Sequence, residues 1–454
     1  MKDRTIYKRT ILLAVPMMIQ NGLTNMVGLI DNVMVGSLET EAMTAVSIIG
    51  QLMFVFNLAV FGGMSGPGIY GAQYFGQKNN DGLRNTFRIK IWIGLFCLAC
   101  GLAAFIFGND FLIGLYLKGE SETVDPTLTL NFAKEYLEIM LLGLAPFIVT
   151  QIYATSMRET GESVIPMTSG IASVFVDIVF NYLLIFGHFG FPRLGVKGAA
   201  VATVLARVVE MTVVLIAANM RKERFAFLQG VFKTLLVPKS IALKIVKKGL
   251  PIFVNEFLWA GGIAALTQCY SRLGLDIVAG LNISNILCNL LNVVFVALGS
   301  AVGIVIGQLL GACEYDRAKK SSFSLMWFTG FVSAGLAALL IAVSGAFPKL
   351  YATTDAIRGY GQGFIIITAA FFPIQGFLNA LYFTLRSGGK TFVTFLFDSV
   401  YTWVAVLPLA VLLCSFTGLP VFAIYAIVQS ADILKLIIGC VLIKKGVWIS
   451  NLVS

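Results

Sequence analysis

Four acidic side chains stand inside long apolar stretches of this sequence, where charged groups are rare. They are Asp31, Asp177, Glu256 and Asp398. An ionisable side chain in hydrocarbon costs about 2.5–3.5 kcal/mol on insertion scales, so each of the four is a functional candidate by default. Binding a cation or taking up a proton relieves a carboxylate in such surroundings. The chemistry that these residues offer is therefore reversible ion binding.

Three polar side chains are candidates for one shared site. Asp177 and Asn181 lie one helical turn apart, so they share a face, and Asp31 lies in the second half of the first apolar stretch. Apolar surroundings and a second nearby carboxylate both favour the protonated form of a carboxyl group. Two such groups titrate as a pair. We expect Asp31, Asp177 and Asn181 to bind Na⁺ or a proton; the alternative is that the two aspartates hydrogen-bond the backbone near a helix kink.

Two further pairs of charges lie within apolar stretches. Arg207 and Glu210 form one pair, and Asp432 and Lys435 form the other, with the order of the charges reversed. Residues three apart are neighbours on a helix surface, so each pair can neutralise itself along one face. This spacing favours a structural role over a role in gating.

The composition shows what kind of protein holds these residues. Of the 454 residues, 58% are apolar and 12% are charged, whereas soluble domains have about 45–50% apolar and about 25% charged residues. A helix of about 20 apolar residues crosses a bilayer. The sequence therefore predicts an all-α integral membrane protein with twelve spans, near residues 10–37, 43–74, 90–108, 131–157, 163–187, 195–219, 250–273, 277–310, 322–347, 360–385, 391–415 and 418–443.

The basic residues indicate how the chain is oriented in the membrane. The net charge is +10, and most Lys and Arg residues fall in alternate connections between spans, starting with the N-terminal segment. Short loops that are rich in Lys and Arg face the cytoplasm. We expect a multi-pass protein of the cell membrane with both termini in the cytoplasm. The charge is thus explained by topology, and no nucleic acid partner is expected.

The two halves of the chain repeat the same landmarks at equivalent places. In the first half these are Pro16, Gln73-x-x-Gly76 and Arg158-x-x-Gly161, and in the second half they are Pro251, Gln308-x-x-Gly311 and Arg386-x-x-Gly389. Six spans is an even number, so the two halves have the same orientation and are related by a pseudo-two-fold axis along the membrane normal. Transporters with this repeat bind substrate between the halves and alternate access. We expect an N-lobe at 1–219, a cytoplasmic linker at 220–248 and a C-lobe at 249–454.

Catalytic and cofactor chemistry finds little support in the sequence. Cys97-x-x-Cys100 has no second ligand pair, and His188 is the one histidine, so zinc is not expected. A membrane enzyme would need a His, Ser or metal-ligand cluster at one membrane face. The chain has no GxxxxGK[ST] loop for a nucleotide. We expect no enzyme activity and no cofactor other than a coupling ion.

Several motifs together resemble those of the multidrug and toxic compound extrusion (MATE) family. The resemblance covers the whole chain and rests on Pro16 with Asp31-Asn32-x-x-x-Gly36, Gln73-x-x-Gly76, Arg158-x-x-Gly161, the run Asn181-Tyr-Leu-Leu-Ile-Phe-Gly187, and Gly195-Val-Lys-Gly-Ala-Ala-Val-Ala-Thr203. No single motif is very specific, but their order is. The family implies export of organic, often cationic, compounds in exchange for Na⁺ or H⁺.

The resemblance also implies roles for individual residues. Asp31 matches the acidic residue of the N-lobe cation site, and Ala199 and Thr203 match positions that complete it. Family members usually show Asn and then Asp four residues later in the fifth span, whereas here Asp177 precedes Asn181. The composition of the site is kept while the two places are exchanged.

In the second half the resemblance is weaker. Glu256 resembles the seventh-span glutamate of many members, while Gln375 stands where some relatives have an acidic residue. Asp398 is then a candidate substitute. Trp259, one turn from Glu256, offers an aromatic face to a bulky cation, which contributes about 0.5–2 kcal/mol.

These observations favour a monomeric, cation-coupled antiporter that exports small-molecule organic cations across the lipid bilayer. A flippase for lipid-linked precursors remains the alternative within the same architecture. A flippase would require a wide cationic cavity, and the acidic residues inside the spans argue against such a cavity.

Overall fold

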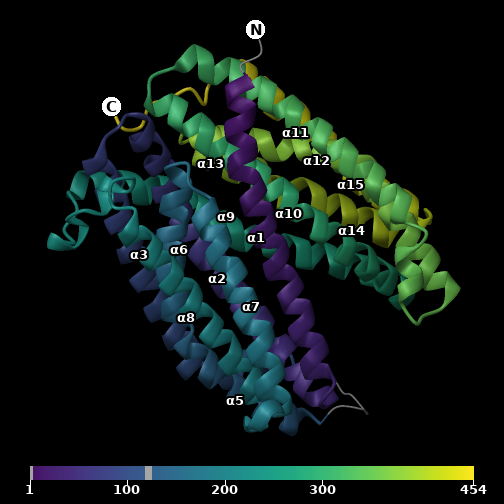
Figure 1. The fold of residues 1–454 in the computed structure, drawn as a ribbon. Coiled ribbons are helices and arrows are strands. Elements are labelled where there is room, and N and C mark those ends of the chain that lie inside the picture. The colour runs from purple at the N-terminus through teal and green to yellow at the C-terminus, as the bar shows by residue number, and fades with distance from the viewer. Residues whose placement is uncertain (1–3, 118–124) are drawn as a thin grey trace. The chain divides into compact units, whose positions relative to one another are not determined.

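The computed structural model describes residues 4–117 and 125–454, and these residues form helices joined by short connections, with no strand among them (Figure 1). The helices are α1 (Arg4–Gly36), α2 (Thr40–Gly76), α3 (Asn80–Phe107), α4 (Asn109–Gly114), α5 (Pro126–Leu142), α6 (Leu144–Glu159), α7 (Val164–Phe186), α8 (Val196–Met220), α9 (Lys239–Ser271), α10 (Leu275–Gly311), α11 (Tyr315–Val343), α12 (Asp355–Ser387), α13 (Thr391–Phe395), α14 (Leu407–Phe416) and α15 (Val421–Lys444).

The predicted all-α membrane fold is confirmed. Within the described residues, 11 helices are long and apolar enough to cross a membrane, and the number rises to 12 if α5 and α6 form one bent span. These two helices meet at Gly143 with a bend of 47°. The sequence predicted one unbroken span at 131–157, so the bend is a correction. The nearby Pro146 explains part of it, because proline and glycine weaken a helix locally.

The chain divides into two compact units. Unit 1 comprises the start of the chain up to Val15, then Ala72–Asn79 and Ile245–Ser454, and unit 2 comprises Pro16–Gly71 and Asn80–Lys244. Both α1 and α2 therefore contribute to each unit. The last residues of the predicted linker, from Lys239 onwards, already belong to α9 and continue into it without a break.

In unit 2, α7 and α8 pack side by side and position several of the candidate residues. Gly187 ends α7 in the left-handed conformation, with φ of 77°, and the chain turns back so that the Leu194 amide donates to the Leu184 carbonyl at 2.8 Å. A Cβ atom at Gly198 would lie 2.5 Å from the carbonyl oxygen of Leu184. This close approach is typical of helices in membranes that meet at small residues.

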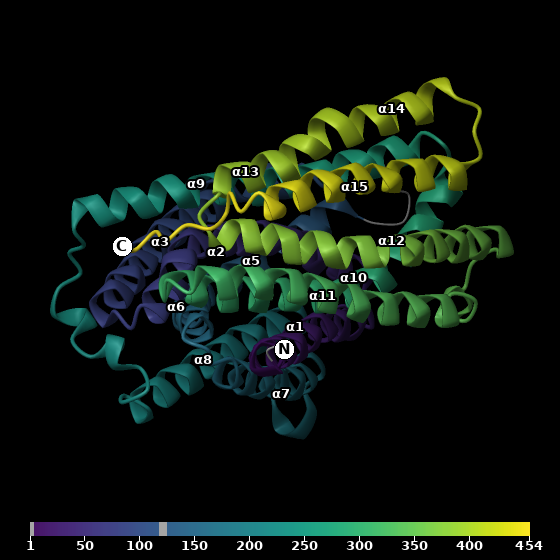
Figure 2. The ribbon, with the colours of Figure 1, turned by 90° about the horizontal axis from the view of Figure 1, so that it is seen from above.

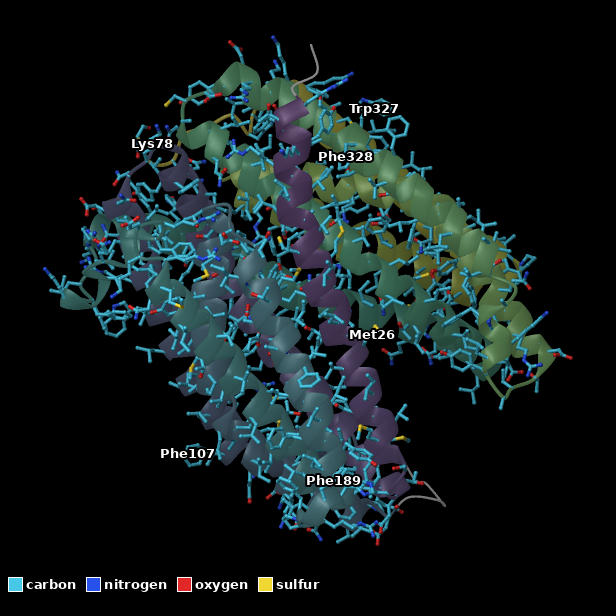
Figure 3. The ribbon with its side chains drawn as sticks, viewed as in Figure 1. Met26, Lys78, Phe107, Phe189, Trp327 and Phe328 are labelled. Atoms are coloured by element: carbon cyan, nitrogen blue, oxygen red, sulfur yellow. The ribbon has the colours of Figure 1, made fainter. Side chains whose placement is uncertain are left out.

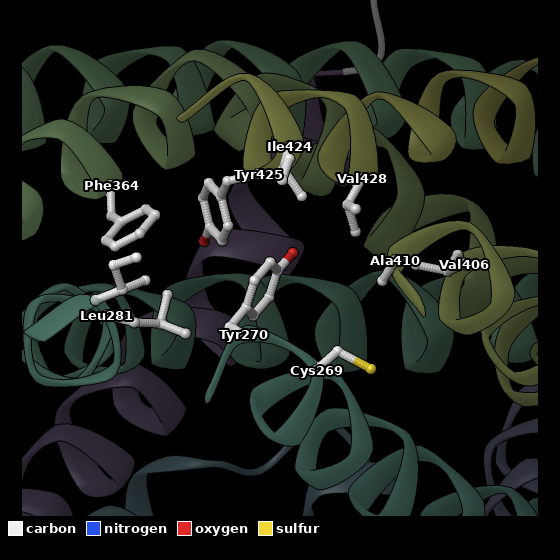
Figure 4. Packing of buried hydrophobic residues seen from close by; sticks show 10 residues of the cluster. Cys269, Tyr270, Leu281, Phe364, Val406, Ala410, Ile424, Tyr425 and Val428 are labelled. Carbon is white, nitrogen blue, oxygen red and sulfur yellow. The ribbon is translucent and has the colours of Figure 1, made fainter. Parts of the chain in front are cut away.

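Unit 1 is built around α12, which contacts α10, α11 and α15 (Figure 2). One apolar cluster joins the ends of α9, α10 and α12 to α14 and α15. It contains Tyr270 beside Tyr425 and Phe364, with ring centroids 5.7 and 4.9 Å from Tyr425 (Figure 4). The first ring pair is tilted and the second is edge-on, and aromatic contacts of this kind stabilise packing by about 0.5–1.5 kcal/mol each.

Between α13 and α14 the helix widens twice. Leu396–Val400 and Thr402–Val406 are π-helical, and the backbone dihedrals stay helical through both. Insertions of this kind re-aim side chains and occur often at functional sites. Here they include Asp398.

The last residues of the chain pack on unit 1. Trp448 is fully buried, and a Cβ atom at Gly388 would lie 1.7 Å from its carbonyl oxygen. The amide of Leu452 donates to Oε1 of Gln73 at 2.7 Å, and Nε2 of Gln73 donates to the carbonyl of Ser387 at 2.9 Å. This segment therefore ties the end of α2 to the end of α12.

Large apolar side chains cover the outside of both units. Phe107 and Phe189 are 88% and 87% exposed, and Trp327 is 60% exposed (Figure 3). Water would disfavour so much exposed apolar surface, whereas lipid accepts it. Together with the apolar helices, this exterior is that of a multi-pass membrane protein.

Candidate functional site

The structure brings Asp31, Asp177 and Asn181 together in unit 2. Nδ2 of Asn181 donates a hydrogen bond to Oδ1 of Asp31 at 2.7 Å and another to Oδ2 of Asp177 at 3.2 Å. Asp177 and Asn181 are buried on α7, and Asp31 comes from α1. One amide group thus holds two carboxylates from different helices, and the alternative of two aspartates bonded only to nearby backbone does not describe this geometry.

Two oxygen atoms of this cluster are buried without a hydrogen-bond partner among the described residues. They are Oδ1 of Asp177 and Oδ1 of Asn181. A buried acceptor left unsatisfied costs about 1–3 kcal/mol, so native structures rarely leave one without a reason. Carboxylate and amide oxygens are hard donors that suit a small cation, and a protonated carboxyl could donate to such an acceptor.

Neighbouring helices complete the surroundings of the acids. Thr203 of α8 donates from Oγ1 to the carbonyl of Ala199 at 3.1 Å and lies close enough to Asp177 and Tyr136 to interact with both. Tyr136 of α5 is buried. Nothing in the sequence singles out Tyr136, because it is one of 14 tyrosines in an apolar chain.

In residues 4–117 and 125–454, no third carboxylate joins the cluster. Among the described residues, no group of three or more His, Cys, Asp or Glu side chains could hold a metal ion. Any ion bound at Asp31 and Asp177 would therefore take its remaining ligands from amide, hydroxyl or backbone oxygens. Such a donor set fits Na⁺ or a proton better than a transition metal.

Arg207 lies near the acids but is held by other groups. Its Cζ atom lies 5.3 Å from the centre of the Phe147 ring, and its Nη1 atom is buried with no hydrogen-bond partner in the described part of the chain. Asp177 and Glu210 lie within electrostatic range of it. Glu210 accepts a hydrogen bond from Gln20 at 3.4 Å, so the predicted self-contained Arg207–Glu210 pair extends to α1.

The second-half candidates lie in unit 1 and form a different arrangement. Nζ of Lys435 lies 2.7 Å from Oδ1 of Asp398, and Nδ2 of Asn255 donates to Oδ2 of Asp398 at 3.2 Å. The sequence predicted that Lys435 would pair with Asp432 on its own helix. That prediction is wrong for the direct contact, since Asp432 accepts its hydrogen bond from Gln375 of α12.

The other two candidates of unit 1 do not touch this ion pair directly. Glu256 is partly buried on α9, with Arg386 and Asp398 within electrostatic range. Trp259 is 39% exposed on the same helix. The α9 residue that contacts Asp398 is Asn255, and nothing in the sequence distinguishes it as a partner of that acid.

Comparison with known proteins identifies the family to which this chain belongs. The MatE family model matches residues 16–183 and 251–412, which is most of the chain and takes in both halves. The chain belongs to the MATE family. It is a family of transporters.

Individual relatives are similar over much or nearly all of the chain. The probable multidrug resistance protein YoeA of Bacillus subtilis is 25% identical over 426 residues, covering 93% of this chain and 90% of the relative. The probable multidrug resistance protein NorM of Thermotoga maritima is 29% identical over 278 residues, covering 61% and 57%. The crystal structure of a mutant of the Vibrio cholerae MATE transporter VcmN superposes with a TM-score of 0.86 at 16% identity, covering 98% and 97%.

Asp177 and Asn181 stand in the opposite order to the one that the family resemblance implied. The two residues lie one turn apart on the same face of α7, and the Asn181 amide contacts Asp177 and Asp31 at once. An acid–amide pair on one face can offer the same donor atoms in either order. The exchange therefore keeps an acid and an amide on the same face of α7.

Proposed function

We propose that this MATE-family chain is a secondary antiporter that exports organic cations in exchange for H⁺ or Na⁺. Asp31, Asp177 and Asn181 bind the coupling ion, and Ala199 and Thr203 complete its surroundings. The observation that carries this proposal is the single amide donor shared by two carboxylates, beside two buried oxygens without partners among the described residues.

The arrangement supplies a physical reason for coupling. Two carboxylates held by one amide repel each other when both are ionised, and a proton or Na⁺ between them removes the repulsion. Ion binding therefore strengthens the hold of α1 on α7, and ion release weakens it. Such a site can favour one conformation over another, because its affinity depends on how closely the two helices approach.

The position of α1 connects this event to the rest of the molecule. Its residues up to Val15 belong to unit 1, and its residues from Pro16 belong to unit 2. A change in how α1 packs on α7 therefore acts on a helix that both units share. Driving a two-state equilibrium from 1:99 to 99:1 needs an ion affinity that differs between the two states by about 10⁴-fold, or about 5.5 kcal/mol. Two buried carboxylates that bind the ion in only one of the states can supply a difference of this size.

The proposed substrates are small organic cations. Two relatives are named as probable multidrug resistance proteins, and the partly buried Glu256 and half-exposed Trp259 offer a carboxylate and an aromatic face to a cation. A flippase for lipid-linked precursors would need basic groups in these places. The proposal includes an N-lobe at 1–219 and a C-lobe at 249–454, both termini in the cytoplasm, location in the cell membrane, and function as a monomer.

The test is transport by the purified full chain in proteoliposomes, with the fluorescent cation ethidium as probe. A pure pH gradient and a pure Na⁺ gradient are applied separately, and one of them should drive uptake. Asp31→Asn should abolish gradient-driven uptake while the protein still inserts and remains monodisperse. Asp276→Asn, which changes an exposed acid at the start of α10, should transport as the unaltered chain does.

Two outcomes would overturn the proposal. Undiminished gradient-driven uptake by Asp31→Asn would remove the ion site from the mechanism. An envelope defect in cells lacking the protein, without any change in tolerance to toxic cations, would favour the flippase.

A further inference from the structure

A basic residue occupies equivalent positions in the two repeats. Arg207 and Lys435 are separated by 228 positions, the same interval that separates Arg158 from Arg386 in the repeated Arg-x-x-Gly motif. Each lies on the last long helix of its half, Arg207 on α8 and Lys435 on α15. The two units use this shared position differently.

In unit 1 the basic residue makes direct contact with a carboxylate. Nζ of Lys435 lies 2.7 Å from Oδ1 of Asp398, and the side chains are 12% and 21% exposed. The Lys435 ammonium also lies 5.4 Å from the centre of the Phe397 ring. The second oxygen of Asp398 accepts from Asn255 at 3.2 Å. Both carboxylate oxygens are therefore occupied by groups of the protein.

The backbone around Asp398 fixes this contact. Asp398 lies in the π-helical turn Leu396–Val400, and Thr402 donates from Oγ1 to its carbonyl at 2.9 Å. The next residue, Ser399, donates to the Asn255 carbonyl at 3.0 Å and to its Oδ1 at 2.7 Å. The side chains of the consecutive residues Asp398 and Ser399 thus both contact Asn255 of α9. The two bonds from Ser399 hold Asn255 in the orientation in which its amide donates to Asp398.

Other charged groups around the Lys435–Asp398 pair help to compensate the positive charge of the Lys435 ammonium. Asp432 lies one turn before Lys435, accepts from Gln375, and is within electrostatic range of the ammonium. In the described part of the chain, Glu256 and Tyr382 also lie within electrostatic range of Asp398, and Tyr401 lies within range of Lys435. Arg386 acts in turn on Glu256 and Tyr382. A buried ammonium between two carboxylates is compensated, whereas removing it would leave an uncompensated buried charge.

In unit 2 the equivalent base does not fill the acid site. Arg207 lies over the Phe147 ring, and Oδ1 of Asp177 has no hydrogen-bond partner among the described residues. The acid pair of unit 2 is therefore held by a neutral amide, while the acid of unit 1 is held by a fixed positive charge.

We propose that Lys435 is a tethered cation that takes the place of a coupling ion at Asp398, so that each transport cycle uses one ion site, in unit 2. This inference rests on the proposed function, because it assigns the number of coupling sites to that function. Removing the ammonium should free Asp398 to bind the transported ion, and Lys435→Met should thereby create a second ion site.

The experiment measures ethidium transport by the full chain in proteoliposomes against the concentration of the ion that drives it, H⁺ or Na⁺. The apparent Hill coefficient should rise from about one in the unaltered chain to a value between about one and two in Lys435→Met, because both ions then act on the same conformational change and the number of sites is the upper limit of the coefficient. Lys435→Arg keeps the charge and should give the unaltered coefficient. The double variant Lys435→Met with Asp398→Asn removes both charges and should also give a coefficient of about one.

Each result either supports or overturns the inference that Lys435 replaces a coupling ion. A folded Lys435→Met with an unchanged coefficient would overturn the inference, and so would a folded double variant that has lost ion coupling, since Asp398 would then carry an ion itself. If Lys435→Met fails to fold, the double variant, which keeps neither charge of the pair, decides alone. Failure of the proposed function is separate, because it appears as undiminished ion-driven transport in Asp31→Asn.

Discussion

Gly76 packs directly against the carbonyl group of Gln308, and Gly311 packs in the same way against the carbonyl group of Gln73. A Cβ atom on either glycine would lie 1.9 Å from the oxygen that it faces. The two Gln-x-x-Gly motifs that repeat in the sequence therefore meet within unit 1, and the glutamine of each motif faces the glycine of the other. The motif is thus explained by a contact between two backbones.

Substitution of these glycines by alanine should destabilise the protein. The obstacle at Gly76 and Gly311 is backbone, which cannot move aside as a flexible side chain can, and overpacking of this kind costs about 1–3 kcal/mol. Gly50→Ala is the matched control, because Gly50 lies on the same helix as Gly76 and has no atom within 4 Å of its added Cβ. Thermal unfolding in detergent should show Gly76→Ala and Gly311→Ala melting below Gly50→Ala; equal melting temperatures would contradict the described contact.

Removing the Asn181 amide should change the affinity for the coupling ion in a direction that depends on the ion. Asn181→Ala deletes hydrogen bonds to two carboxylates, and each hydrogen bond to a charged group contributes about 1.5–3 kcal/mol. Because these bonds stabilise the ionised carboxylates, their loss should strengthen proton binding, whereas Na⁺ binding should weaken because the Oδ1 ligand is lost as well. A change of about 1.5–3 kcal/mol corresponds to about a tenfold to hundredfold change in affinity. The concentration of coupling ion that gives half-maximal transport measures the change. A shift of less than about twofold would mean that the amide is not part of the ion site.

Two threonines of α8 provide a matched pair. Thr203 and Thr212 both donate to the carbonyl four residues earlier, at 3.1 and 2.7 Å, but Thr203 lies beside Asp177 while Thr212 is exposed. Thr203→Ala should change the affinity for the coupling ion, with tighter binding of a proton or weaker binding of Na⁺, and Thr212→Ala should leave it unchanged. Because the two substitutions affect the helix equally, a similar effect from both would show that the change arises from the helix and not from the site.

The buried pair of Lys90 and Glu159 should be important for stability. Lys90 is fully buried and donates to Oε1 of Glu159 at 2.6 Å and to Oγ of Ser156 at 2.9 Å. Breaking a buried pair by removing one partner costs about 3–5 kcal/mol. Lys90→Met should therefore lower stability strongly in a denaturation experiment, and adding Glu159→Gln should restore part of it.

An exposed ion pair serves as the comparison for Lys90. Lys134 and Asp110 also form an ion pair, but their side chains are 35% and 71% exposed. Exposed pairs contribute about 0–1 kcal/mol, so Lys134→Met should have little effect. If the two lysine variants were equally stable, burial would not be the cause.

Much of the fold could be predicted because the bilayer restricts the choices. Twelve apolar stretches follow from hydropathy and length. The prediction of an unbroken span failed at Gly143, because Gly143 and Pro146 allow a helix to bend but do not by themselves determine the bend of 47°. The proximity of Asp31 and Asp177 could be anticipated, since isolated acids in hydrocarbon are too costly.

The partners of individual side chains were harder to predict. Lys435 was assigned to Asp432 because spacing along a sequence reports only neighbours on the same helix. The actual partner, Asp398, depends on a π-helical turn that no spacing rule foresees. Tyr136 was missed for a related reason: its place beside the acids depends on how α5 packs on α8.

The buried position of Trp448 and the bond from Leu452 to Gln73 have a practical consequence for handling the protein. Only Val453 and Ser454 would separate a fluorescent reporter or an affinity tag joined after Ser454 from the Leu452 amide, which holds the end of α2. A bulky group at this position would disturb the packing of α2, the helix that carries Gly76. Fusions should therefore carry a flexible spacer after Ser454, so that the hydrogen bond between Leu452 and Gln73 is kept.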